Sequence, residues 1–376
     1  MTSASPTLSL IVASRNEGTH LHNTLQAALA IAPPTGGLEI SVVDDASSDG
    51  SSRFLDHTPW LQQREAGQIR LTRVGERLGV SRARRRGAIG CRGEVLVFLD
   101  AHLTFPQERF WLDLLARFDD PGCDLLGVDC FDQRTLCSTA GSVYSSKRLC
   151  HQAPTWVPIQ SEPLPFQPVP FVNGGFFAIR RHVYEHHEGF PDCLQGWGHE
   201  DRLLSMLAGL CGYRCWLDQS LRVGHLYKDA FKNHDGVPEQ PWQDPHPEDG
   251  VAPPNVQFIH AQQGEGPVPL MLLNSLRCAS LLYDEHHFAL TVEQLQHDFG
   301  SLSLQQGLDV LAQERPQLDA YLHRVGLPPS LRDQRLTAFL QQFRTVLPML
   351  DEAELHFCCT VHDQAHALDR IRTLPM

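Results

Sequence analysis

The sequence predicts an α/β fold in which a doubly wound, mostly parallel sheet is followed by a helical C-terminal subdomain. Two observations support this. Short β-branched runs alternate with helical patterns from Leu8 to Cys130, and from about Pro269 Leu, Gln and Ala recur at helical spacing. Such alternation is typical of a parallel sheet with helices on both faces. We therefore expect an α/β domain over residues 1–232, a proline-rich lid or linker over 233–268 and a helical subdomain over 269–376.

The elements of the α/β domain are predicted in close succession. Strands are expected at residues 8–13, 38–43, 69–74 and 94–100, with helices at 21–31, after Asp49 and at 82–89. Residues 131–170 lose periodicity and hold six prolines between Pro154 and Pro170, which predicts a long loop. A strand within 172–181, a helix within 197–210 and two strands at 213–218 and 220–227 complete the domain.

Composition excludes several classes of protein. The chain has 376 residues, 42% of them hydrophobic, and a net charge of −13. That charge argues against nonspecific binding to nucleic acid or anionic lipid. Eleven cysteines without a CxxC pair favour reduced thiols, the N-terminus resembles neither a signal peptide nor an anchor, and no apolar run reaches the length of a transmembrane segment. We expect a cytoplasmic protein.

Acidic and imidazole side chains follow two of the predicted strands. Asp100 and His102 are two residues apart at a strand end, so both side chains point the same way. A carboxylate and an imidazole suit Mn²⁺ or a related divalent cation such as Mg²⁺, although a structural role is the alternative. His225 ends a later strand, where a packed or surface histidine is equally compatible with the sequence.

Other polar segments allow two interpretations each. Asp44 and Asp45 favour either a turn and helix cap or contacts to a uracil or a ribose. Seven arginines between Arg70 and Arg86 form either a solvated helix face or a diphosphate site. The histidines at 182, 186 and 187 have the spacing of some zinc helices but lack partners, so we expect them at the surface.

Taken in order, these segments resemble the GT-A glycosyltransferases of family 2, and most closely the catalytic domain of the polypeptide N-acetylgalactosaminyltransferases. The resemblance extends over about 60% of the chain. The segments that carry it are SRNEG (14–18), VVDDASSDGS (42–51), RLGVSRARRRGA (77–88), VLVFLDAH (95–102), NGGFFAIRR (173–181), QGWGHEDRL (195–203) and RVGHLYK (222–228).

The resemblance implies roles for individual residues. Asp100, His102 and His225 correspond to the metal ligands, and Trp197 and Glu200 to residues beside the donor sugar. The other implied donor-binding residues are Arg15, Glu17, Asp44, Asp45, Arg77, Asp100, Ala101, Gly174, Gly175 and Lys228. Gly174 and Gly175 would let the sugar approach the backbone.

The sequence also departs from the family pattern. Lys228 replaces an arginine expected on the diphosphate, and Asp201 replaces an asparagine. Inverting family 2 enzymes commonly place their catalytic base at such a Glu-Asp pair, so Asp201, or next Glu200, is a candidate base and the stereochemistry stays open. The lectin domain of the eukaryotic enzymes is not recognisable in the C-terminal helices.

We therefore expect a metal-dependent transfer of a hexose or N-acetylhexosamine from a UDP-sugar to a peptide, glycan or small-molecule acceptor. Nucleotidyl transfer onto a sugar phosphate and non-catalytic binding of a nucleotide-sugar or glycan are the alternatives. The C-terminal helices are expected either to shape the acceptor side or only to cover apolar surface of the main domain.

Overall fold

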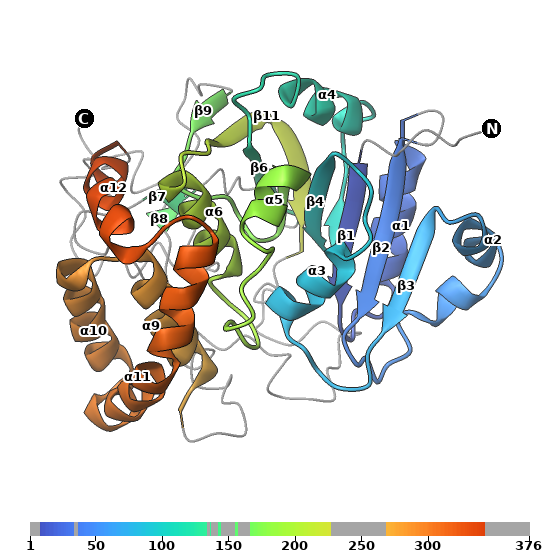
Figure 1. The fold of residues 1–376 in the computed structure, drawn as a ribbon. Coiled ribbons are helices and arrows are strands. Elements are labelled where there is room, and N and C mark those ends of the chain that lie inside the picture. The colour runs from blue at the N-terminus through green and yellow to red at the C-terminus, as the bar shows by residue number, and fades with distance from the viewer. Residues whose placement is uncertain are drawn as a thin grey trace.

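The computed structural model describes residues 8–33, 37–133, 136, 142–143, 155–156, 166–226 and 268–342 (Figure 1). Its strands are β1 (Leu8–Ser14), β2 (Leu38–Asp44), β3 (Ile69–Arg73), β4 (Val95–Asp100), β5 (Leu103–Thr104), β6 (Leu125–Asp132), β7 (Ser142–Val143), β8 (Thr155–Trp156), β9 (Phe166–Pro168), β10 (Phe176–Arg180) and β11 (Cys215–His225). The helices are α1 (His20–Ala30), η1 (Arg53–Asp56), α2 (Trp60–Glu65), α3 (Val80–Ala88), α4 (Phe110–Arg117), α5 (Arg181–His186), α6 (Glu200–Leu210), α9 (Leu270–Leu282), α10 (Glu285–Phe299), α11 (Ser301–Arg324) and α12 (Pro329–Gln342).

One sheet organises the α/β part, with the strand order β3-β2-β1-β4-β10-β6-β11-β5 and with β9 beside β11. Strands β1 to β4 are parallel to their neighbours within this group, whereas β10 is antiparallel to β4 and β6. The carboxyl ends of β1, β2 and β4 coincide, since Ser14 lies opposite Asp44 and Ala13 opposite Asp100. Ligands of such sheets bind at this edge.

Both faces of the sheet are buried, which explains the unbroken apolar run of β4. Val97 and Leu99 point into a core shared with α1, α2 and α4, while Leu96 and Phe98 point into a second core shared with α5 and α6. Alternate residues of a strand face opposite sides, so a central strand needs apolar residues at every position. The predicted fold class is confirmed.

The C-terminal helices share a core with the α/β part. Met271 and Leu276 of α9 pack with Leu203 and Leu207 of α6 in one apolar cluster, which α10, α11 and α12 extend. These helices gather at the end of the molecule away from β3, with α6 beside them (Figure 1). They therefore cover apolar surface of the main domain, as the second sequence-based alternative expected. The domain bounds stay a prediction, because nearly all of residues 233–268 lie outside the described ranges.

Several predicted elements differ from the structure. The two strands expected at 213–218 and 220–227 are the single strand β11, which stays continuous through an irregularity between Asp218 and Arg222. The loop predicted over 131–170 contains the end of β6 and the short strands β7, β8 and β9. The helix expected after Asp49 corresponds to η1 and α2, whereas α4 and α5 were not foreseen. Within the described residues, no helix has the length and apolar character needed to cross a membrane.

Candidate functional site

Three candidate metal ligands converge at the carboxyl edge of the sheet. Asp100 ends β4, His102 follows two residues later, and His225 ends β11, which pairs with β5 so that His225 lies opposite Leu103. Ligand atoms of the three side chains lie within 4.8 Å of one another. Nε2 of His225 is 3.1 Å and Nε2 of His102 is 3.8 Å from Oδ2 of Asp100. The structure thus brings together residues 125 positions apart.

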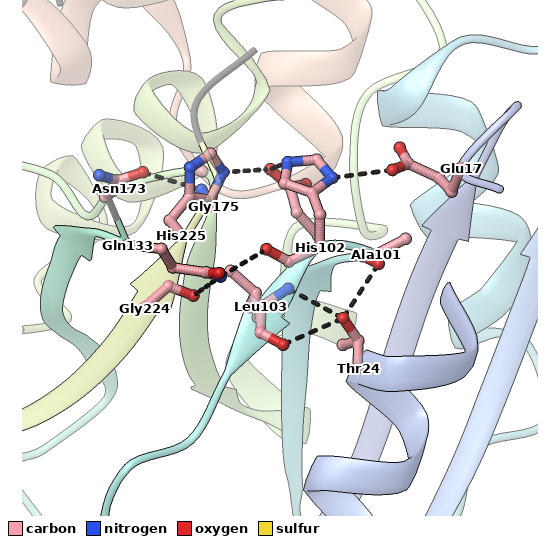
Figure 2. A network of polar contacts seen from close by, with 12 residues as sticks. Glu17, Thr24, Ala101, His102, Leu103, Gln133, Asn173, Gly175, Gly224 and His225 are labelled. Carbon is pink, nitrogen blue, oxygen red and sulfur yellow. Dashed lines mark hydrogen bonds and ion pairs between the residues drawn. The ribbon is translucent and has the colours of Figure 1, made fainter. Parts of the chain in front are cut away.

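Neighbouring groups orient these ligands (Figure 2). Nδ1 of His102 is 3.0 Å from a carboxylate oxygen of the buried Glu17, so the opposite ring nitrogen faces Asp100. The amide of Gln133 donates to the carbonyl oxygens of His102 (3.1 Å) and Gly224 (2.9 Å), tying the two ligand-bearing segments together. Glu17, expected in the donor site, is placed here as a partner of a ligand. A carboxylate on the far nitrogen is the usual support of a metal-binding histidine.

Two further backbone features shape the cluster. Thr24 bonds to the carbonyl oxygens of Ala101 and Leu103 and accepts from the Leu103 N–H, which fixes the chain on both sides of His102 (Figure 2). Gly175 lies against His225, because a Cβ at Gly175 would be 2.9 Å from Cδ2 of that imidazole. The missing side chain of Gly175 therefore makes room for a candidate ligand.

A buried arginine holds the cluster on its other side. Arg84 of α3 is 1% exposed and donates to Oδ1 of Asp100 (2.8 Å), to the carbonyl oxygen of Gly174 (2.6 Å) and to Glu200 (3.2 Å). Burial would raise the pKa of Asp100, but the hydrogen bond to His225 and the charge of Arg84 together hold it well below its usual range. Asp100 is thus an anion with one oxygen held by Arg84 and the other facing two imidazoles.

This donor set fits a divalent cation. One carboxylate and two imidazoles, grouped at a sheet edge with oxygen-binding positions left for other ligands, suit Mn²⁺ and its neighbours. Both Nε2 atoms face the same oxygen of Asp100, so the three side chains could bind one cation.

Asp44, the last residue of β2, and Asp45, which follows it, bond to two different segments of the backbone. Asp45 accepts hydrogen bonds from the backbone N–H groups of Leu78 (2.6 Å) and Gly79 (2.9 Å) and thereby holds the loop before α3. Its pKa is raised by burial, against the effect of those two bonds. Asp44 accepts from the Ser47 N–H (2.9 Å) and from the hydroxyl of Ser52. Asp44 therefore bonds within its own turn, as the turn interpretation predicts, whereas Asp45 bonds to a loop 33 and 34 residues further along the chain.

Glu200 and Asp201 begin α6 but have unlike surroundings. Glu200 is 5% exposed, and one of its oxygens, Oε2, has no hydrogen-bond partner among the described residues. Burial and the nearby Asp201 raise its pKa to about 7, while Arg84 opposes the rise. Asp201 is only half-buried, and a Cβ at Gly174 would lie 3.0 Å from its Oδ2. The carboxylate of Asp201 therefore borders the glycine pair.

The remaining predicted residues are more peripheral. Trp197 is 45% exposed on the loop before α6. Arg15 donates to the carbonyl oxygen of Asp45 (3.3 Å), and the exposed Arg77 lies close enough to lower the pKa of Asp45. Lys228 lies outside the described residues. The surface prediction is wrong for His187, which is buried and bonds through Nδ1 to the Val183 carbonyl (2.7 Å), whereas His182 and His186 are exposed.

Sequence analysis did not single out Arg84 from its six neighbouring arginines. The signal that could have found it is the phase of α3, because Ser81, Ala83 and Gly87 are small residues on the buried side of the same helix. A long charged residue among small buried ones marks a side chain that reaches a buried partner.

Comparison with known proteins links part of this chain to a family. Residues 9–187 match the model of glycosyl transferase family 2. Asp44, Asp45, Asp100 and His102 lie within this match, whereas His225 follows it.

Individual relatives of the chain carry related names. The chain is 31% identical over 244 residues to the inactive polypeptide N-acetylgalactosaminyltransferase-like protein 5 of Macaca fascicularis, covering 62% of this chain and 54% of the relative. It is 30% identical over 243 residues to polypeptide N-acetylgalactosaminyltransferase 15 of Homo sapiens, covering 60% and 36%. The chain thus spans about half or less of the length of these relatives.

A solved structure supports the fold of the chain. GalNAc-T7, crystallised with UDP, GalNAc and Mn²⁺, superposes with a TM-score of 0.60 and 18% identity, covering 90% of this chain and 56% of that one. The expected GT-A fold is confirmed.

Proposed function

We propose that this protein is a metal-dependent glycosyltransferase that moves a hexose or N-acetylhexosamine from a UDP-sugar to an acceptor. The observation that carries the proposal is the convergence of Asp100, His102 and His225 at the carboxyl edge of the sheet, in a chain that matches family 2 over residues 9–187. The named N-acetylgalactosaminyltransferase relatives and the UDP and Mn²⁺ in the GalNAc-T7 crystal support the same donor and cation.

Each side chain at the sheet edge has a definable task in such a transfer. A divalent cation bound there would neutralise negative charge that develops on the departing diphosphate. Arg84 and Glu17 hold Asp100 and His102 in place, so the ligands are preorganised. Asp45 fixes the loop that ends at Gly79, on the donor side of the sheet.

We assign the general-base role to Asp201 and not to Glu200. A base must reach the attacking hydroxyl. Glu200 is 5% exposed and ion-paired with Arg84, whereas Asp201 is half-buried and borders Gly174. The assignment makes the transfer inverting, with Asp201 on the acceptor side of the donor sugar.

The acceptor class and the cellular location are proposals from the sequence alone. A peptide, a glycan and a small molecule all stay candidate acceptors. A cytoplasmic location agrees with the free thiols of the seven described cysteines, and fractionation of cells with labelling of free thiols tests it.

Incubation of the full chain with a panel of UDP-sugars and Mn²⁺ tests the function through release of UDP, which transfer to water also produces. We expect release with at least one UDP-sugar, its loss on chelation, and its loss in Asp100→Asn. His182→Ala, which changes an exposed histidine outside the cluster, should release UDP normally. Binding of UDP-sugar without release would favour a non-catalytic protein, and pyrophosphate release from a nucleoside triphosphate with a sugar phosphate would favour nucleotidyl transfer.

A further inference from the structure

The loop from Gln195 to His199 has an unusual backbone. Gly196, Gly198 and His199 all have positive φ, at 65°, 103° and 72°. Glycine adopts this region freely, but histidine does so at a cost in free energy, so contacts from elsewhere must hold it there. The loop carries Trp197 and leads directly into Glu200 and Asp201 at the start of α6. Its conformation therefore sets where these side chains lie.

Helix α9 of the C-terminal part supplies such contacts. The fully buried Asn274 accepts from the Gln195 N–H (3.1 Å) and donates to the carbonyl oxygens of Gln195 (2.6 Å) and Trp197 (3.3 Å). A single amide of α9 thus satisfies three backbone groups of one loop. Buried polar groups need such partners, and losing them leaves the loop groups unpaired.

The next residue of α9 holds the other end of the loop. The hydroxyl of Ser275 donates to the Met271 carbonyl (2.8 Å), so it accepts from Nε2–H of His199, at 2.9 Å. His199 is the residue with the strained backbone, and this bond lies directly before the first turn of α6. Asn274 and Ser275 therefore form hydrogen bonds with the loop on both sides of Gly198.

The opposite side of the loop contacts the donor side of the sheet. The Val80 N–H donates to the carbonyl oxygen of Gly196 (2.9 Å), and Gly79 pairs with Gly196 as an isolated bridge. Asp45 holds Gly79 in turn. The loop is therefore bonded to α9 on one side and to Gly79 and Val80 on the other.

We propose that Asn274 and Ser275 are positioning residues that place Trp197 and the start of α6 for sugar transfer, so that the C-terminal helices contribute to the reaction through this loop. The inference rests on the proposed function. It differs from a purely structural role of α9, in which its apolar face alone would matter.

The test compares Asn274→Ala and Ser275→Ala with Ser280→Ala in the full chain. Ser280 is a buried serine of the same helix whose backbone carbonyl binds Arg332, away from the loop. The chain is labelled with 5-fluorotryptophan, and the ¹⁹F resonance of Trp197 is assigned by its loss in Trp197→Phe. We expect this resonance to shift or broaden in Asn274→Ala and Ser275→Ala and to stay unchanged in Ser280→Ala.

Kinetics give the second readout. Turnover should fall about tenfold to a hundredfold in Asn274→Ala with little change in KM for the donor, because misplacement of reacting groups acts mainly on the chemical step. If Asn274→Ala does not fold, the ¹⁹F spectrum and the turnover of Ser275→Ala, which removes only one hydroxyl, test the proposal instead. An unchanged Trp197 resonance, or the same change in Ser280→Ala, overturns the proposal. Absence of transfer in the unaltered chain refutes the proposed function, while the ¹⁹F comparison still tests the positioning.

Discussion

Replacement of Arg84 by methionine should be among the most destabilising changes in the α/β part. The guanidinium is 1% exposed and makes three charge-assisted or backbone bonds, to Asp100, Gly174 and Glu200. Methionine retains the length of the side chain but leaves two carboxylates without their shared cation. Removing one partner of a buried ion pair costs about 3–5 kcal/mol. We expect a loss of that size in the free energy of unfolding at pH 8 without added metal.

Urea unfolding followed by circular dichroism measures the loss. Arg86→Met, an exposed arginine of the same helix, is the matched control and should change stability by less than about 0.5 kcal/mol. The double variant Arg84→Met with Glu200→Gln should recover about 1–3 kcal/mol, because the second change removes a carboxylate that has lost its partner. The Arg84→Met loss should also be smaller at pH 5, where Glu200 is protonated. A loss at pH 8 no larger than that of Arg86→Met would refute the network.

Three further variants test other parts of the site. In the metal-free chain the pKa of Glu200 is raised from 4.5 to about 7, so the folded state binds the proton of Glu200 more tightly than the unfolded state does. The free energy of unfolding should therefore fall by up to about 3 kcal/mol as pH rises from about 4.5 to 7. Glu200→Gln should lack this part of the pH dependence, and an identical pH profile of both chains would contradict the prediction. Gly79→Ala places a Cβ 2.5 Å from the Gly196 carbonyl oxygen at a φ of 83°, so it should lower the melting temperature and weaken UDP-sugar binding in calorimetry. Gly75→Ala is the control, because no atom of the described residues lies within 4 Å of its Cβ, and equal effects of the two changes would argue against the bridge between Gly79 and Gly196. Asp201→Asn should reduce turnover about a hundredfold or more with donor affinity nearly unchanged, and near-normal turnover, or a product with the anomeric configuration of the donor, would end the base assignment.

Much of the sheet could be predicted because its central strands are buried on both sides. The apolar runs that end at Ser14, Asp44 and Asp100 are typical of parallel strands that are buried on both faces. Strand β11 was divided in the prediction because Asp218 and Ser220 interrupt its apolar pattern. In the structure Asp218 is buried and bonds to Arg117, an ion pair that connects β11 with α4 and that no local pattern reveals.

The site could be predicted only in part for a related reason. Strand alternation places Asp100 and His102 on one side, but their meeting with His225 depends on the pairing of β5 with β11, and only the family resemblance indicated it. Gly175 was expected to make room for a sugar, and the structure gives it a contact with His225. The role of Asn274 was missed, although a buried-helix pattern interrupted by Asn-Ser is itself a sign of a polar partner.

The most direct test of the account is an anomalous diffraction map of the full chain crystallised with UDP and Mn²⁺. The account predicts one manganese peak bonded to Asp100, His102 and His225 and to the diphosphate of UDP, with Arg84 still on the second oxygen of Asp100. A manganese peak elsewhere, or UDP bound at the sheet edge with no metal among these three side chains, would contradict it.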